Sequence, residues 1–438
     1  MRETPAALVI AWGLLATFQF GYGISELNAI QEKFTCTGES DCLGLSANAF
    51  GIITSMFTLG GAISSFLCGM LVKQVDGVFI ATLRNAALAG STGSVLLILS
   101  STTFFLGLGR FFQGIAAGVG ITLVPVLLKT VSPPAISGSV GVLNQVAIVT
   151  GIFCAQATGM LTCANNWRAV AALCTLVACA QYFGGHVIKL APGDAHEDDE
   201  SAPAVPSSVV VEQEPSDQLH AAPSQTLPAQ MPQPPLSSAT QSYQSGLRII
   251  VLTQLAQQLS GVNAIMFYST GILSAVMPGV AQYVGLLITV VNGVMTFPPI
   301  YLIDERRVGR KRLLVGSAAG MGLCCLVLAY SLSTARVGMS AFAIVAVIAC
   351  FSVGLGPVPF VIMPEVVPKA DASRAASLGM TVNWVSNAAV ALAFQPVRTI
   401  LSPIDGGAGG LVFVIFGVVN LVFAALIAQR YTYMGSSI

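Results

Sequence analysis

Residues 257–269 read QQLSGVNAIMFYS. The stretch places Gln258 and Asn263 inside an apolar segment that runs from about residue 247 to 275. At the 100° per residue of an ideal helix, these two amides lie about 140° apart and cannot face one cavity. Ser260-Gly261 stands between them, and glycine relaxes the backbone. We therefore expect a membrane helix that is interrupted here, so that its amides converge on one polar site.

Eleven further apolar segments accompany this one. Each exceeds the roughly 20 residues that a helix needs to cross a bilayer. Only 9% of the 438 residues are charged and the mean hydropathy is +0.79, whereas soluble domains carry roughly 25% charged residues. These values exclude a water-soluble enzyme and predict an all-α membrane protein with twelve transmembrane helices. The other segments lie near residues 6–30, 47–72, 79–100, 104–128, 138–161, 167–190, 280–303, 313–334, 339–364, 374–396 and 409–429.

The composition also excludes several chemistries. Nineteen basic and nineteen acidic residues cancel, so the chain has no electrostatic footprint for nucleic acid. Three His and ten Cys show no zinc spacing and no C-x-x-C pair, so we expect no metal, no cofactor and no catalytic residues. Cys36 and Cys42 share one loop, where an oxidising compartment would permit a disulfide. Two free thiols are the alternative.

Residues 191–246 interrupt the apolar pattern. They hold nine Pro, eight acids and no Lys or Arg, which predicts a disordered, acidic, Pro-rich linker. The linker divides the chain into a six-helix half at 1–190 and a second six-helix half at 247–438. It is either a plain tether or a regulatory element.

Lys and Arg residues predict the orientation in the membrane. With the N-terminus in the cytosol, the loops on that side hold fourteen of them against five on the other side, and Arg110 is counted among the five. Both termini and the linker are therefore expected to be cytosolic. Plasma membrane and vacuolar membrane both stay open.

The two halves resemble each other at their fourth segments. Pro125 precedes Val131-Ser132-Pro133 in the first half, and Pro364 precedes Val366-Val367-Pro368 in the second. Parallel repeats around a central site describe the major facilitator fold.

Amides are the dominant polar groups of the predicted spans. A buried amide without partners costs a few kcal/mol in an apolar setting, so such groups connect helices or line a cavity. Amides donate and accept without charge, which suits a hydroxyl-rich neutral molecule such as a sugar, and aromatic faces suit its apolar side. The amides are Gln19, Asn28, Asn144, Gln145, Gln254, Gln257, Gln258, Asn263, Asn292, Asn383 and Asn387, and the aromatics are Phe20, Phe267, Tyr268, Phe360 and Trp384.

The opening stretch resembles the seventh-helix signature of the sugar porter family of major facilitators, which includes hexose facilitators and proton–sugar symporters. QFGYGISELNAIQ at 19–31, GRFFQGIAAGVGITLVP at 109–125 and GVLNQVAIVTGIFCAQ at 141–156 resemble the family's first, fourth and fifth helices. VGLGPVPFVIMPEVVP at 353–368 resembles the tenth. The GISELN stretch is most similar to a fungal branch of the family.

The resemblance implies a set of sugar-binding residues. Ser352 stands where many members have a binding Glu, which alters the hydrogen-bonding set, and Phe360 stands where many have Trp. The implied set is Gln145, Gln257, Gln258, Asn263, Asn292, Phe360, Asn383 and Trp384.

The resemblance also bears on proton coupling. Proton-coupled members carry Asp after the GY of the first helix, whereas this chain has Gly23, which cannot titrate. Facilitated diffusion is therefore favoured. Glu26, the only acid in the first segment, either serves as a proton site or faces water at the cavity mouth.

A cytosolic gate is the last feature that the resemblance implies. The gate residues are Arg310, Lys311, Glu365 and Arg374, while Thr130 and Ser137 replace their charged counterparts in the first half. Two outcomes stay open: a weaker lock with a larger inward-facing population, or replacements that pack equally well.

These observations predict a twelve-helix sugar porter, not an enzyme, whose partners are a sugar, a hexose first of all, and the lipid bilayer. Two alternatives stay open. One is a carrier of another polyol or a small organic acid, such as inositol or quinate. The other is a sugar sensor that does not transport. The sequence is silent on oligomeric state.

Overall fold

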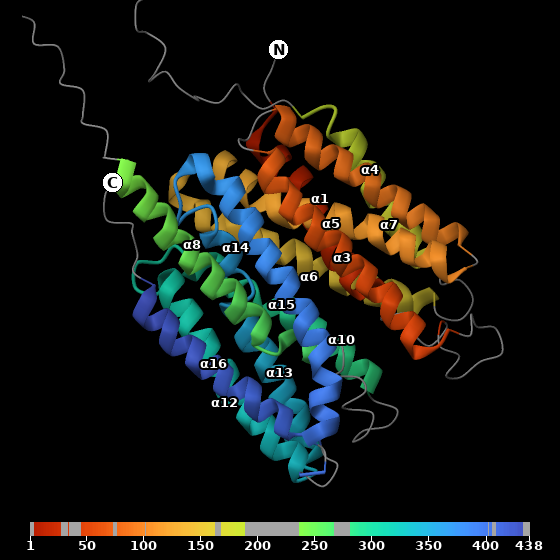
Figure 1. The fold of residues 1–438 in the computed structure, drawn as a ribbon, viewed down its shortest axis with the longest axis vertical. Coiled ribbons are helices and arrows are strands. Elements are labelled where there is room, and N and C mark those ends of the chain that lie inside the picture. The colour runs from red at the N-terminus through yellow and green to blue at the C-terminus, as the bar shows by residue number, and fades with distance from the viewer. Residues whose placement is uncertain are drawn as a thin grey trace, which may run out of the picture.

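The computed structural model describes residues 4–27, 34, 45–72, 77–100, 102–162, 168–188, 236–266, 281–401, 403–404 and 409–431. Within these residues the regular structure is entirely helical. Figure 1 shows two bundles side by side, one of red-to-yellow N-terminal helices and one of green-to-blue C-terminal helices.

The first bundle contains six helices in the places that the apolar segments predict. α1 packs on α6, α3 packs on α5, and α4 lies between α5 and α7. A 3₁₀ turn at Pro134–Ile136 leads from α5 into α6. The helices are α1 (Ala6–Glu26), α3 (Ala47–Leu71), α4 (Gly77–Leu99), α5 (Thr103–Val131), α6 (Ser137–Thr162) and α7 (Arg168–Gly184).

The second bundle has the same plan but more interruptions. Its eighth and tenth apolar segments are each split into two helices, and a 3₁₀ turn at Lys369–Asp371 precedes α15 as Pro134–Ile136 precedes α6. The helices are α8 (Leu236–Leu259), α10 (Ala281–Met295), α11 (Pro298–Leu302), α12 (Gly309–Ser333), α13 (Val337–Val353), α14 (Val358–Ile362), α15 (Ala372–Leu401) and α16 (Leu411–Arg430).

Nine helical stretches of the described chain are long and apolar enough to cross a membrane. The other three predicted spans are α4, α7 and α15. α7 falls just short in length, and α15 carries Asn383 and Asn387 in place of apolar residues. Together they give the twelve-helix major facilitator fold that the sequence predicts.

The structure differs from the sequence predictions at the start of α8 and at Arg110. α8 begins at Leu236, so its first turns lie inside the segment predicted as linker; residues 189–235, like Cys36 and Cys42, lie outside the described residues. Arg110, counted as an outer-loop charge, is a buried residue of α5. The Lys and Arg bias rests on fourteen residues against four once Arg110 is left out.

The predicted interruption at Ser260-Gly261 is confirmed. α8 ends at Leu259 and helical geometry resumes at Val262. Gly261 has a φ of +85°, and a Cβ there would lie 2.6 Å from the Phe416 ring. Asn420 of α16 donates a 2.9 Å hydrogen bond to the Ser260 carbonyl that the break releases.

We expect Gly261→Ala to lower the thermal unfolding midpoint clearly, because the left-handed backbone and the Phe416 contact both oppose a Cβ. Gly316→Ala is the matched control, since Gly316 lies inside α12 with open space around it. Fluorescence-detected unfolding of both variants in detergent measures the difference. Equal midpoints for the two would contradict the strained break.

The two bundles meet along paired helices. α3 contacts α15, and α6 contacts α10 and α11. Ser377 of α15 donates a 2.5 Å hydrogen bond to the Ser65 carbonyl of α3, and the ring of Trp384 lies against Gly61. Side chains of both bundles therefore form one apolar cluster that includes Phe20, Phe57, Phe360 and Trp384.

Candidate functional site

A network of buried amides joins α8 to α15. Asn383 donates from Nδ2 to the Oε1 atoms of Gln254 and Gln257, both over 2.7 Å. Gln258 donates from Nε2 to Asn383 Oδ1 over 3.0 Å. All four side chains are buried, because their positions on α8 and α15 turn toward the line where these helices meet.

The broken tenth segment provides the next wall of the network. Between α13 and α14 the backbone leaves the helix, which frees carbonyl groups. Gln257 Nε2 donates to two of them, over 2.8 Å to Leu355 O and 3.0 Å to Gly356 O. An unwound stretch of membrane helix thus contributes polar backbone atoms to the site.

Beyond the break in α8, the network reaches its less buried edge. Asn263 donates from Nδ2 to Gln258 Oε1 and, over 3.1 Å, to Asn387 Oδ1. Asn263 and Asn387 are both only half-buried. The break therefore brings the side chains of Gln258 and Asn263 into contact, which an unbroken helix would not allow.

Trp384 extends from α15 toward the first bundle. Its Nε1 donates to Ser65 Oγ of α3 over 3.0 Å. Its ring makes edge-on contacts with Phe20 of α1 at 5.5 Å and with Phe57 of α3 at 5.8 Å between centroids. Phe20, Phe57 and Trp384 thus form an aromatic wall that both bundles share. Trp384 directly follows Asn383 in α15, so the wall adjoins the amide network.

The remaining predicted binding residues lie near this region with different partners. Phe360 belongs to the same apolar cluster as Trp384. Asn292 of α10 accepts a 2.8 Å hydrogen bond from Ser352 of α13. Among the described residues, neither Asn292 nor the buried Gln145 of α6 hydrogen-bonds to the amide network. Phe267 and Tyr268 lie outside the described residues.

Glu26 does not face water at a cavity mouth. It is 1% exposed, as is Arg110 of α5, and Arg110 Nη1 lies 3.1 Å from Glu26 Oε2. Arg110 also donates to Gln113 Oε1 over 3.0 Å and to the Gly23 carbonyl over 2.8 Å. A buried charge needs such pairing, since an unpaired one costs several kcal/mol.

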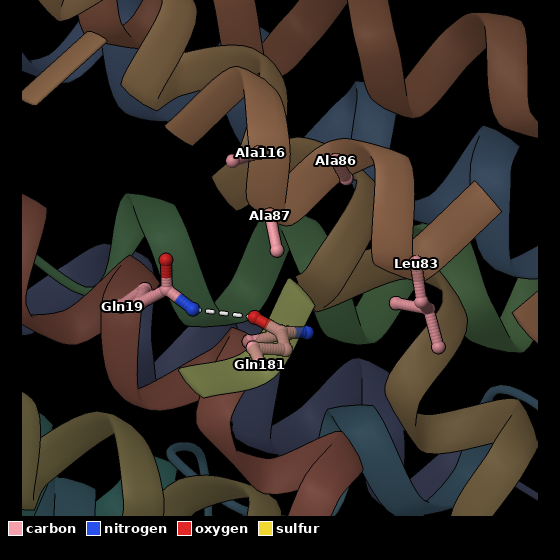
Figure 2. A pocket seen from close by; sticks show the side chains of 7 residues that line it. Gln19, Leu83, Ala86, Ala87, Ala116 and Gln181 are labelled. Carbon is pink, nitrogen blue, oxygen red and sulfur yellow. Dashed lines mark hydrogen bonds between the residues drawn. The ribbon is translucent and has the colours of Figure 1, made fainter. Parts of the chain in front are cut away.

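A small pocket lies inside the first bundle, away from the amide network. Figure 2 shows Gln19 of α1 donating to Gln181 of α7 beside Ala86, Ala87 and Ala116. Trp12 also donates to the Gln181 carbonyl, over 2.8 Å. The pocket is lined mainly by alanine and lies within the first bundle, apart from the amide network. We therefore do not assign it as the substrate site.

Ion pairs close one end of the bundle. Arg310 of α12 makes a two-pronged pair with Glu365, over 2.7 Å from Nε and 2.8 Å from Nη2. Its Nη1 lies 3.1 Å from Asp304 Oδ1. Lys129 of α5, in the first bundle, lies 3.7 Å from Glu365.

The start of α6 completes this closed end. Ser139 donates to Asp304 Oδ2 from its backbone N over 2.8 Å and from Oγ over 2.9 Å. An acid of the second bundle therefore receives N–H donors at the helix N-terminus of the first, where a negative charge is stabilised. The Ser139–Asp304 contacts therefore connect the two halves at the end where the first half has the uncharged residues Thr130 and Ser137 in place of charged gate residues.

Two of the four predicted gate residues take part in these contacts. Arg310 and Glu365 form the central pair. Arg374 is exposed, and no ion pair of the described residues involves Arg374 or Lys311. Ser139 and Asp304 were missed, because the contact is made by a backbone N–H and by an acid displaced in sequence from the usual gate position.

A two-part bundle of membrane helices, with a buried amide network in the second part beside an aromatic wall shared by both parts and ion pairs at one end, defines a transporter of the major facilitator class. Residues 7–432 match the family model described as "Sugar (and other) transporter". The chain belongs to this sugar transporter family, a family of transporters and not of enzymes.

Known relatives agree with this placement. The chain is 30% identical to the solute carrier family 2 facilitated glucose transporter member 4 of Mus musculus, over 95% of this chain and 86% of that protein. It is 27% identical to a probable metabolite transport protein of Saccharomyces cerevisiae, over 95% and 90% of the two chains. The fold matches the proton:xylose symporter XylE with a TM-score of 0.76 at 17% identity, over 97% and 95%.

Proposed function

We propose that the protein carries a hexose across its membrane by alternating access, as a facilitator without proton coupling. The observation that carries the proposal is the amide network of α8 and α15, which offers hydrogen-bond donors and acceptors without charge beside an aromatic wall. The facilitated glucose transporter that the chain resembles supports the same substrate class.

Substrate recognition would follow from exchange of hydrogen bonds. In the structure the amides bond to one another. Each amide has two donor hydrogens and an oxygen with two lone pairs, so ring hydroxyls can replace these contacts at little net cost. The residues proposed to bind sugar are Gln145, Gln257, Gln258, Asn263, Asn292, Phe360, Asn383 and Trp384.

Alternating access would use the closed end as one gate. Release of the Lys129–Glu365 and Ser139–Asp304 contacts would free the halves to rock apart around the site. Arg310 supports both contacts, because it pairs with Glu365 and with Asp304. We place this end on the cytosolic side, together with both termini and the 191–246 linker, in a plasma or vacuolar membrane. The positive-inside bias supports that orientation.

Proton symport is the second candidate, because Glu26 is an acid buried beside Arg110. One of its oxygens, Oε1, has no hydrogen-bond partner among the described residues. Gly23 removes the usual carboxylate from the first helix, and Arg110 already balances the charge of Glu26. These two facts favour facilitated diffusion.

A ligand panel tests the substrate class. Purified protein is heated with D-glucose, D-xylose, inositol, quinate or L-glucose, and the unfolding midpoint is measured. A ligand that binds only the folded state raises it, so D-glucose should stabilise more than L-glucose and quinate. Stabilisation by inositol or quinate alone would replace the hexose with the polyol or acid alternative. Stabilisation by glucose without uptake in vesicles would favour a sensor.

A further inference from the structure

Phe57 of α3 occupies a position between two features that are separate in sequence. Its ring centroid lies 4.4 Å from Arg110 Cζ, within the range of a cation–π contact. On another side its ring contacts Trp384 at 5.8 Å and 68°. Phe57 is 4% exposed, so this ring connects the buried Glu26–Arg110 pair directly with the aromatic wall.

Gly23 provides the space for this ring. A Cβ on Gly23 would lie 2.7 Å and 2.9 Å from two carbons of the Phe57 ring, closer than packed atoms approach. The Gly23 carbonyl meanwhile accepts a 2.8 Å hydrogen bond from Arg110. The absence of a side chain at residue 23 therefore places an aromatic ring beside the guanidinium, while the carboxylate comes from Glu26.

Trp384 has limited freedom at this contact. Its Nε1 donates to Ser65, and its ring contacts both Phe20 and Phe57, which also stack on each other at 6.5 Å between centroids. Of these three rings in the described part of the chain, Phe57 is the one that makes a cation–π contact with Arg110. Because Phe57 contacts Trp384 directly, a shift of the Phe57 ring would change the packing of Trp384.

From this geometry we propose that Phe57 is a positioning residue for Trp384, seated in the space that Gly23 leaves open. Through it, the charge balance of Glu26 and Arg110 sets the orientation of the aromatic wall and hence the affinity for sugar. The inference rests on the proposed function, because it assigns Trp384 to the sugar site. It applies to a facilitator and does not require proton movement.

A double-mutant cycle tests the proposal. The protein retains Trp384 as its only tryptophan through Trp12→Phe and Trp167→Phe, so its fluorescence reports on that ring. Phe57→Leu should weaken D-glucose binding by about 3- to 10-fold through loss of one aromatic contact. Glu26→Gln, which leaves Arg110 unneutralised beside the ring, should shift Trp384 emission and change glucose affinity by about threefold or more.

The coupling is measured by combining the variants. In the Phe57→Leu protein, Glu26→Gln should change neither emission nor affinity by more than about 1.5-fold. The Phe20→Leu protein loses an aromatic neighbour of both Trp384 and Phe57 but keeps the contacts of Phe57 with Arg110 and Trp384, so most of the effect of Glu26→Gln should remain. Gly23→Ala should reproduce Phe57→Leu, because it displaces the ring.

Each outcome is decisive. Equal effects of Glu26→Gln with and without Phe57, or no effect in either protein, would overturn the proposal. If Glu26→Gln does not fold, Arg110→Gln replaces it, because it changes the same charge balance by removing the cation that pairs with Glu26 and contacts the Phe57 ring. An emission shift without any glucose response would leave the coupling intact and contradict the proposed substrate instead.

Discussion

Gln258→Ala is expected to lower the initial rate of glucose uptake into proteoliposomes by about 100-fold. The amide of Gln258 connects Asn383, Gln257 and Asn263, so its removal leaves two buried partners each short of one hydrogen bond. Each such loss costs about 1–3 kcal/mol, and about 2.7 kcal/mol corresponds to 100-fold. The variant also loses the group that exchanges hydrogen bonds with the sugar.

Gln181→Ala is the matched control for this variant. It removes another buried amide that is bonded to an amide, Gln19, but inside the first bundle and away from the network. Uptake by this control should stay within about twofold of the parent protein. Similar losses in both variants, or a Gln258→Ala protein with unchanged uptake, would remove the amide network from the transport site.

Arg310→Gln is expected to open the closed end. Arg310, Glu365 and Asp304 are only partly exposed, at 13%, 12% and 22% of their side-chain areas. Loss of the guanidinium leaves both carboxylates without their main partner, at about 2–3 kcal/mol, and the ratio of open to closed protein should rise roughly 30- to 150-fold. Ser137, buried at this end, reports the change as Ser137→Cys by its rate of reaction with a charged thiol reagent.

Lys311→Gln provides the comparison for this measurement. Lys311 is the next residue in α12, but the ion pairs of the described residues do not include it. Its substitution should leave the Ser137→Cys reaction rate unchanged within about twofold. A rate that is the same in Arg310→Gln and Lys311→Gln would show that the ion pairs do not hold this end closed.

The sequence predicts the number and order of the transmembrane helices well, because each span is a long apolar run that ends near helix-breaking residues. The break at Ser260-Gly261 follows from the angle between Gln258 and Asn263, and the structure contains it. The start of α8 was misplaced, since Leu236 directly follows Pro234 and Pro235 in the segment predicted as linker. Composition reports solvation on average and does not locate a helix end.

The candidate site was predictable in kind but only partly in its contacts. Amides within apolar runs indicate a polar site, and six of them meet in one network. Arg110 was wrongly counted as an outer-loop charge. It is buried because it pairs with Glu26, which is 84 residues away in sequence, and a local sequence pattern does not show such a partner. Ser139–Asp304 was not predicted, because one of its two donors is a backbone N–H and its partners are 165 residues apart in sequence.

The accumulation ratio in proteoliposomes distinguishes facilitated transport of a hexose from proton-coupled transport. Labelled D-glucose is added with and without an inward proton gradient, and the internal concentration is followed to its plateau. We predict the same plateau in both cases, equal to the external concentration, and an initial rate about 100-fold lower in Gln258→Ala. A plateau above the external concentration that appears only with the gradient would contradict facilitated diffusion and assign proton coupling to Glu26.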